Sequence, residues 1–216
     1  MDVGAGRTHA QVCALFERLA EPDRVEAVSM DMSLVFREAV RLCLPQAQIV
    51  ADHFHVVQHV GKALSRVVRR VASSPAGRSA LKGRGHLFLR PQDALTPEQE
   101  DTRADLAVLF PEAQAAWQHK EALRHWYATA TTATATLGLD TWMVNVEREG
   151  PSECREMLAA FRTWREEILA FFLFLPTRIS NGFVEGKNNR TKALMRQAYG
   201  YRNRRHLRLH ILLGAA

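Results

Sequence analysis

Three carboxylates occupy positions in the sequence where they could bind a divalent cation. Asp31 and Asp52 each follow a short apolar segment, and Glu185 is isolated among basic residues near the end of the chain. Oxygen ligands of this kind suit Mg²⁺ or Mn²⁺, and converging carboxylates that hold two such ions promote phosphoryl transfer. The alternative interpretation of Asp31 and Asp52 is structural, because each precedes a predicted helix and could serve as its N-cap.

Basic residues surround Glu185 and indicate a phosphate-binding surface. The predicted DNA-binding residues are Lys187, Arg190, Lys192, Arg196, Arg202, Arg204 and Arg205. The first four recur at helical spacings, and Tyr199, Tyr201 and His206 could stack on bases. A net charge of +6 and a pI near 9.6 also favour an anionic partner. An ordinary solvated face is the competing interpretation, but the near absence of acidic residues argues against internal pairing.

Histidines follow Asp52 and form a second candidate site. His55 and His59 have the i, i+4 spacing of two zinc ligands on one helix face. No Cys or Glu nearby would complete a tetrahedral zinc site. Local hydrogen bonding or contact with DNA is therefore the favoured interpretation of these side chains.

The first sixty residues predict the elements that position Asp31 and Asp52. A capping box at Thr8 and Gln11 opens a helix that ends before Pro22, and Ser33 caps a second helix that ends at Pro45. Residues 25–30 and 48–51 are short apolar strands. A strand–helix–strand unit makes the two strands parallel, and ligands of open α/β sheets gather beyond the carboxyl ends of the strands. Both aspartates fall at that edge.

The pattern from residue 54 onward is helical. Residues 73–85, rich in Gly, Ser and basic residues, predict a loop or hinge. Pro111, Gly138 and Gly150 mark breaks between helices predicted at 97–109, 111–136, 138–147 and 152–172. Their aromatic residues, including all four tryptophans, have the helical spacing of a packed core. Two further helices are predicted, at about 183–200 and 203–213.

Composition excludes several classes of protein. An apolar content of 47% can form a core and argues against disorder. The three cysteines are too far apart for a disulfide framework or a structural zinc site and are predicted to be small core residues. No apolar run is long enough to span a bilayer, and the first residues lack the apolar region of a signal peptide. We therefore expect a cytoplasmic, nucleoid-associated protein with no membrane partner.

Four motifs together resemble the ISL3-family transposases of bacterial insertion sequences. The resemblance extends over nearly the whole chain, and the order of the motifs makes it specific. The motifs lie at residues 28–33, 44–57, 181–188 and 199–203.

This resemblance implies a ribonuclease-H-like fold with a helical insertion and a DDE triad that cuts and joins double-stranded DNA at transposon ends with Mg²⁺ or Mn²⁺. By position, Asp31 matches the second Asp of the triad and Glu185 the closing Glu, which makes both the implied catalytic metal ligands. Asp52 and His55 resemble a D-x-x-H element with a supporting role. An alternative assignment takes Asp31, Asp52 and Glu185 as the triad itself.

The implied fold class is α/β but mostly helical. A truncated ribonuclease-H-like core with a short parallel βαβ unit is expected at 1–60, the helical insertion at 61–178, and core helices carrying Glu185 and the basic face at 179–216. The family core opens with three strands, the first of which carries the first Asp of the triad, and the residues before Asp31 match only one helix and one strand. We therefore expect the C-terminal part of a transposase from a truncated or split reading frame, inactive alone or dependent on a partner.

Two other functions remain open on the sequence. The first is a non-catalytic DNA-binding regulator that self-associates or forms mixed oligomers with a full-length transposase. The second is a helical interaction module with an incidental basic tail. Loss of activity in Glu185→Gln would favour the enzyme, and DNA affinity that is independent of salt would favour the interaction module.

Overall fold

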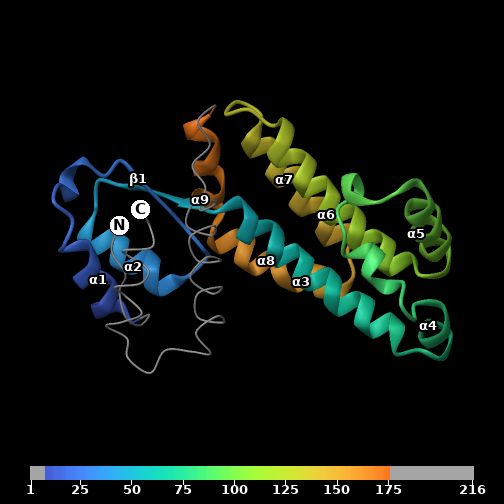
Figure 1. Ribbon diagram of the computed structural model, residues 1–216. Helices are drawn as coiled ribbons and strands as arrows, with labels where there is room; N and C mark the ends of the chain where they lie inside the picture. Colours follow the sequence, from blue (N-terminus) through green and yellow to red (C-terminus); the bar gives the residue numbers. More distant parts are fainter. Residues whose placement is uncertain (1–7, 176–216) are drawn as a thin grey trace, which may run out of the picture. The chain divides into compact units, whose positions relative to one another are not determined.

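The computed structural model describes residues 8–175, which are mostly helical and contain one two-stranded parallel sheet (Figure 1). These residues divide into two compact units, which we call unit 1 (residues 8–52) and unit 2 (residues 53–175). Glu185 and the predicted basic face lie outside the described residues. The domain limits predicted from the sequence, and the ribonuclease-H-like character of the core, stay predictions.

Unit 1 contains the elements that hold the two aspartates. Its elements are α1 (His9–Phe16), the 3-10 helix η1 (Pro22–Arg24), β1 (Ala27–Met30), α2 (Leu34–Cys43) and β2 (Gln48–Ala51). The amide oxygen of Gln11 accepts hydrogen bonds from the Thr8 N–H at 3.1 Å and from its hydroxyl at 2.9 Å, so the residues of the predicted capping box meet. The predicted order of helix, strand, helix and strand is confirmed.

The sheet of unit 1 has a defined parallel register. Ala27 of β1 is opposite Gln48 of β2, and Met30 is opposite Ala51. Backbone hydrogen bonds continue past both ends of the paired strands. The Gln48 N–H donates to the Glu26 carbonyl at one end, and the Asp52 N–H donates to the Met30 carbonyl at the other, both at 2.8 Å. Most of β2 is buried, as are Ala39 and Val40 of α2, so the short strands belong to a small apolar core.

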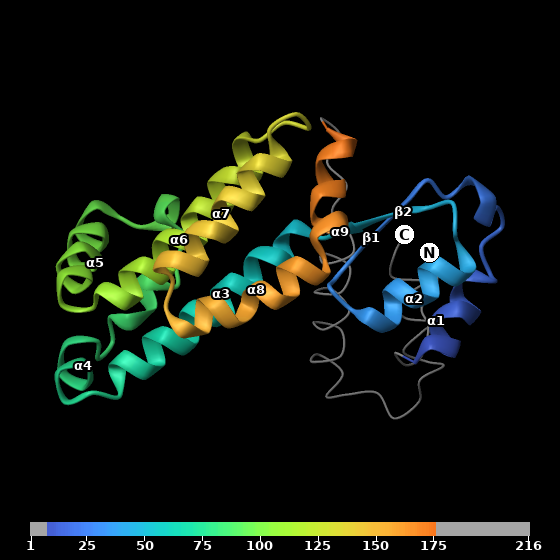
Figure 2. The same ribbon diagram turned by 180° about the vertical axis from the view of Figure 1, so that it is seen from behind.

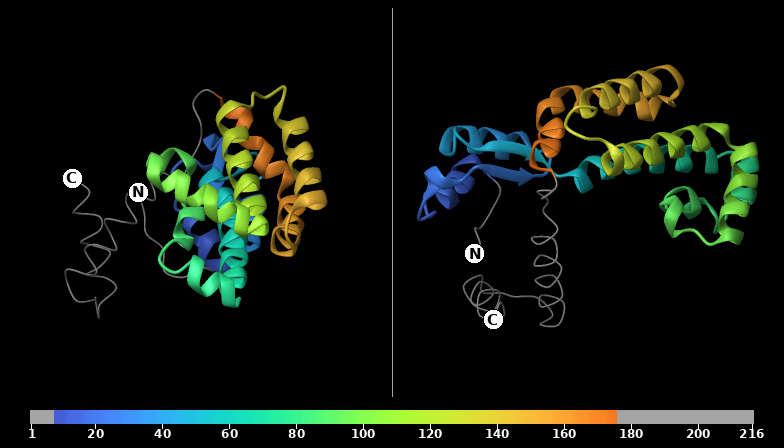
Figure 3. Two further views of the ribbon diagram at one scale, coloured as in Figure 1. Left: turned by 90° about the vertical axis from the view of Figure 1, so that its right-hand side faces the viewer. Right: turned by 90° about the horizontal axis from the view of Figure 1, so that it is seen from above.

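Unit 2 is built around a four-helix bundle. Helices α3 (His53–Ala72), α6 (Pro111–Thr129), α7 (Ala135–Glu149) and α8 (Ser152–Thr163) lie side by side, α3 and α7 each between α6 and α8 (Figure 2). The shorter elements are α4 (Pro75–Ala80), η2 (Gly85–Phe88), η3 (Gln92–Ala94), α5 (Pro97–Leu109), α9 (Arg165–Leu169) and η4 (Ala170–Phe174). Helices α4 and α5 lie at the end of the bundle opposite the start of α3 (Figure 3).

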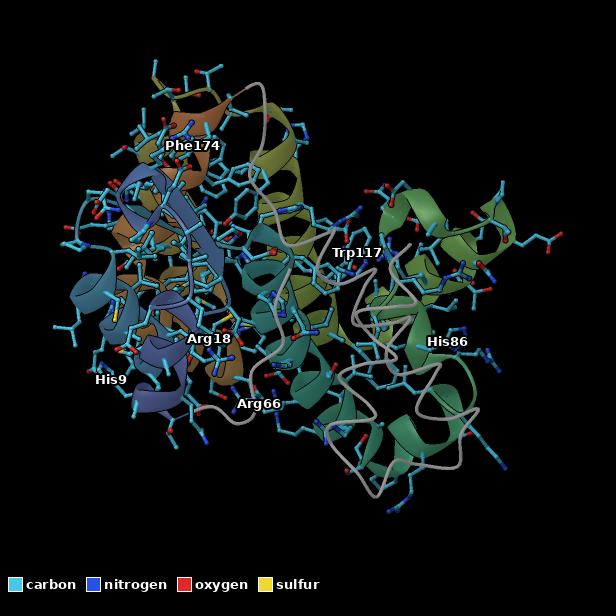
Figure 4. All side chains as sticks on the ribbon, turned by 60° about the vertical axis from the view of Figure 1, so that its left-hand side comes forward. His9, Arg18, Arg66, His86, Trp117 and Phe174 are labelled. Carbon is cyan, nitrogen blue, oxygen red and sulfur yellow. The ribbon has the colours of Figure 1, made fainter. Side chains whose placement is uncertain are left out.

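Aromatic side chains fill the core of unit 2, as predicted. Trp117, Trp126, Trp142 and Trp164 are all buried. The indole N–H of Trp142 donates to the His119 carbonyl at 2.9 Å, so this buried polar atom has a partner. The guanidinium of Arg103 lies 3.9 Å from the ring centroid of Trp117, which is labelled in Figure 4. No helix among residues 8–175 is both long and apolar enough to cross a bilayer.

Several local predictions differ from the structure. The segment predicted as a loop at 73–85 contains α4, because the Ser74 hydroxyl accepts from the Gly77 N–H at 3.0 Å and Pro75 suits the first helical position. The predicted helix 152–172 is divided into α8, α9 and η4. Of the cysteines predicted in the core, Cys154 is buried, whereas Cys13 and Cys43 are half-buried.

The predicted break at Gly138 was also wrong. Helix α6 ends at Thr129, and α7 runs from Ala135 through Gly138 to Glu149. A Cβ atom at position 138 would lie 2.5 Å from Cδ1 of Trp126. This glycine therefore allows α7 to approach the indole closely and does not interrupt the helix.

Candidate functional site

Asp31 and Asp52 follow the two paired strands at the same edge of the sheet. Asp31 comes after Met30, the last residue of β1, and Asp52 comes after Ala51, the last residue of β2. Met30 and Ala51 are register partners in the parallel sheet. The Asp52 N–H donates to the Met30 carbonyl at 2.8 Å, so the parallel ladder reaches as far as the two aspartates. The structure thus brings the main chains of these two predicted site residues together.

The two carboxylates differ in burial and in their surroundings. Asp52 is buried, with 1% of its surface exposed, and Asp31 is half-buried. The Oδ1 atom of Asp31 is buried and has no hydrogen-bond partner among residues 8–175. A buried carboxylate oxygen with unused lone pairs is costly unless a donor or a cation meets it.

The structure bears on the N-cap interpretation of Asp31, whereas that of Asp52 stays a prediction. Ser33, and not Asp31, occupies the N-cap position of α2, and the Ser33 N–H donates to the Asp31 carbonyl at 2.7 Å. Asp52 directly precedes α3 and keeps the position of an N-cap. Asp31 therefore has no capping role that would account for its carboxylate.

The predicted metal ligands can be compared with the structure only in part, because Glu185 lies outside the described residues. Within residues 8–175, no group of three or more His, Cys, Asp or Glu side chains could hold a metal ion. This range supplies no further ligands for zinc at His55 and His59. The pKa of His59 is lowered by burial and by the nearby Lys62 and His55, which favours the neutral ring. Asp31 and Asp52 offer the hard oxygen donors that suit Mg²⁺ or Mn²⁺.

A pocket in unit 2, which we call the α3–α6 pocket, was missed by the sequence analysis. Its volume is about 250 Å³. It is lined from α3 by His53, Phe54 and Val57, from α6 by Arg124 and Tyr127, and from η4 by Phe171. These aromatic residues have the same helical spacing as core residues, so periodicity did not separate them from the core. The pair His53–Phe54 at the predicted start of a helix was the only local signal.

Basic residues on α3 are paired within unit 2. Arg66 donates to Glu156 of α8 at 2.8 Å, and it is labelled in Figure 4. Arg70 donates to Glu153 of α8 at 2.8 Å and to both carboxylate oxygens of Glu112 of α6 at 3.0 Å. The hydrogen bond from Arg70 lowers the pKa of Glu153 to about 2. These arginines thus join helices of the bundle.

Comparisons with known proteins add to this geometry. The family model of ISL3-type DDE proteins, described as "Transposase", matches residues 1–211. A transposase for insertion sequence element IS1001 of Bordetella parapertussis is 26% identical over 220 residues. The match covers 97% of this chain and 52% of the relative, so the chain spans about half the length of that protein. No solved structure matches the chain.

Proposed function

Because the chain belongs to the ISL3 family of transposases, we propose that Asp31 and Glu185 form a divalent metal centre that cleaves and joins DNA strands, with Asp52 and His55 in supporting roles. Two observations carry this proposal. Met30 and Ala51, the residues just before Asp31 and Asp52, are paired at one edge of the sheet. The buried Oδ1 of Asp31 has no hydrogen-bond partner among residues 8–175. The parallel strands between helices support a ribonuclease-H-like core as part of the same proposal.

The residues divide the chemistry between them. When bound, Mg²⁺ or Mn²⁺ supplies Lewis acidity at the phosphate and lowers the pKa of a bound water or hydroxyl. The Asp31 carboxylate extends from the end of a hydrogen-bonded strand, which fixes its main chain as a ligand platform. Asp52 supplies a second, buried negative charge at the same edge, and a nearby cation would offset the cost of burying it.

Phosphate binding is assigned to the basic segment around Glu185. Its residues are Lys187, Arg190, Lys192, Arg196, Arg202, Arg204 and Arg205. Cationic side chains bind duplex DNA mainly through its phosphate backbone and release the counterions condensed on it. The affinity falls steeply as the salt concentration rises, because the release of counterions then contributes less free energy. The pairing of Arg66 and Arg70 with acids in unit 2 is consistent with this assignment, because it commits two of the basic residues of α3 to structural roles.

The activity is tested with the full chain, Mn²⁺ and duplex DNA that carries the ends of the insertion sequence encoding it. Cleaved and joined strands are separated on denaturing gels. We expect any nicking or joining to need the metal and to be lost in Asp31→Asn and Glu185→Gln, with DNA affinity retained. Asp23→Asn is the matched control, because Asp23 is an exposed acid of η1 in the same unit. Unchanged activity in Asp31→Asn would refute the assignment.

DNA affinity is measured separately, by fluorescence anisotropy over a range of salt concentrations. We expect Lys187→Ala and Arg190→Ala each to reduce the slope of log K against log salt by about 1. Arg24→Ala is the control, since Arg24 is exposed and paired with Glu21. Metal-independent binding with no cleavage in any variant would instead support the non-catalytic regulator.

A further inference from the structure

We propose that the α3–α6 pocket binds a single unstacked nucleobase of the DNA substrate. This inference rests on the proposed function, because it assigns part of the DNA to unit 2. The lining of the pocket is aromatic on three elements, and its chemistry and size favour one planar heterocycle over a phosphate or a larger ligand.

Three rings in mutual contact line the pocket, and two of them, Tyr127 and Phe171, are almost fully buried. The centroids of His53 and Phe171 are 5.2 Å apart, those of Tyr127 and Phe171 are also 5.2 Å apart, and those of His53 and Tyr127 are 5.7 Å apart. The ring of Tyr127 also contacts that of Trp126, with a centroid separation of 4.6 Å. Rings that already contact one another in the free protein lose little side-chain entropy when a ligand arrives.

Phe54 offers an aromatic surface at the rim. About half of this residue is exposed (51%), although it is a large apolar side chain at the first turn of α3. Stacking of a base on an aromatic side chain contributes about 1–3 kcal/mol and tolerates any sequence, because every base has a π-face. An exposed ring beside an aromatic pocket therefore compensates for the stacking that a base loses when it leaves its duplex.

The charge of the pocket argues against a phosphate. Arg124 is its cationic wall, but this guanidinium donates to Glu121 at 2.6 Å and to the two oxygens of Asp93 at 3.1 and 3.2 Å. Two carboxylates therefore offset its charge and hold its plane in place. An immobilised, neutralised guanidinium suits a flat base edge or face better than it suits a dianionic group.

The size of the pocket limits its occupant. Pockets for drug-sized ligands are about 300–1,000 Å³, and this one is about 250 Å³. One heterocyclic base fits such a volume, whereas a base pair does not. Phe54 also follows Asp52 by only two residues in the sequence.

The test compares three DNA duplexes that share one insertion-sequence end. The first is fully paired, the second has one unpaired overhanging nucleotide, and the third has an abasic sugar at that nucleotide. We expect the full chain to bind the unpaired base about 5- to 150-fold more tightly than the abasic form, which corresponds to the stacking energy of one base.

Two variants remove the preference in different ways. Phe54→Ala takes away the rim ring, and Val57→Phe fills the pocket; both should bind the unpaired and abasic duplexes equally while retaining affinity for the paired duplex. Leu137→Ala is the control, because Leu137 is exposed on α7 and does not line the pocket. Tryptophan fluorescence and circular dichroism check that each variant is folded.

The outcomes separate this inference from the proposed function. Salt-dependent DNA binding with no preference for the unpaired base, or a preference that survives in both Phe54→Ala and Val57→Phe, would overturn the pocket and leave the proposed function intact. Absence of DNA binding under all conditions would refute both.

Discussion

Replacement of Glu153 by Gln removes one of the two carboxylates that pair with Arg70 in the helix bundle of unit 2. The Glu153 side chain is 11% exposed and accepts from Arg70 of α3 at 2.8 Å, and Arg70 also binds Glu112 of α6. One arginine thus connects α3, α6 and α8. Removing the Glu153 charge from this network leaves Arg70 paired with Glu112 alone and breaks its charged link to α8.

The magnitude follows from the pKa of Glu153, which falls from 4.5 to about 2 in the folded chain, chiefly through the hydrogen bond from Arg70. At 1.36 kcal/mol for each pKa unit, this fall corresponds to about 3 kcal/mol of folding free energy. The Arg70 side chain is 45% exposed, and solvent screening reduces the figure. We therefore expect Glu153→Gln to destabilise unit 2 by about 2 kcal/mol at pH 7.

The same pKa fixes the sign of the pH dependence. Because the folded pKa of Glu153 lies below its unfolded value, its stabilising contribution is complete above about pH 4.5 and is lost as the pH falls toward 2. Glu153→Gln lacks this contribution at every pH. The difference in unfolding free energy between wild type and variant should therefore shrink as the pH falls from 5 toward 2.

Urea denaturation followed by tryptophan fluorescence measures this effect in unit 2. All four tryptophans of the chain lie in that unit. Glu156→Gln is the matched control on the same helix, because the Glu156 side chain is 62% exposed and pairs with a half-exposed Arg66. It should cost at most about 0.5 kcal/mol. Equal effects of the two substitutions, or a Glu153→Gln effect that does not change with pH, would refute the reasoning.

Two further predictions concern packing and thiol chemistry. Gly138→Ala places a Cβ atom 2.5 Å from Trp126 and should lower the melting temperature, whereas Gly61→Ala, with nothing within 4 Å, should raise it through the better helix propensity of Ala. The side-chain hydrogen bond that Cys43 makes with Cys13, followed by burial, raises the pKa of Cys43 to about 11. Alkylation of Cys43 by iodoacetamide at pH 8, followed by mass spectrometry, should therefore be slow and should accelerate several-fold in Cys13→Ala; equal rates would contradict this.

Local signals in the sequence predicted much of the fold. Strand β2 has the predicted bounds, and α5 begins at Pro97 after a Thr96 cap whose hydroxyl accepts from the Gln99 N–H at 3.3 Å. The role of Gly138 could not be predicted in the same way, because it depends on Trp126, which is on another helix. Sequence alone treats a glycine as a break, and only tertiary packing shows when it is a contact.

In the candidate site too, local features could be predicted from the sequence and features that depend on tertiary packing could not. The placement of Asp31 and Asp52 followed from two strand ends and a parallel crossover, which are local features. The α3–α6 pocket joins Phe54, Arg124 and Phe171, which are far apart in the chain and meet only through the folding of the bundle. Their spacing carries no information about whether a ring faces a cavity or the core.

Binding of Mn²⁺ to the full chain tests the proposed metal centre most directly. The free ion is followed by electron paramagnetic resonance in wild type, Asp31→Asn, Glu185→Gln and the Asp23→Asn control. We predict saturable binding by wild type and control, and at least about tenfold weaker binding in Asp31→Asn and Glu185→Gln, because each loses a charged oxygen ligand. Indistinguishable Mn²⁺ affinities across all four proteins would contradict a centre built on Asp31 and Glu185.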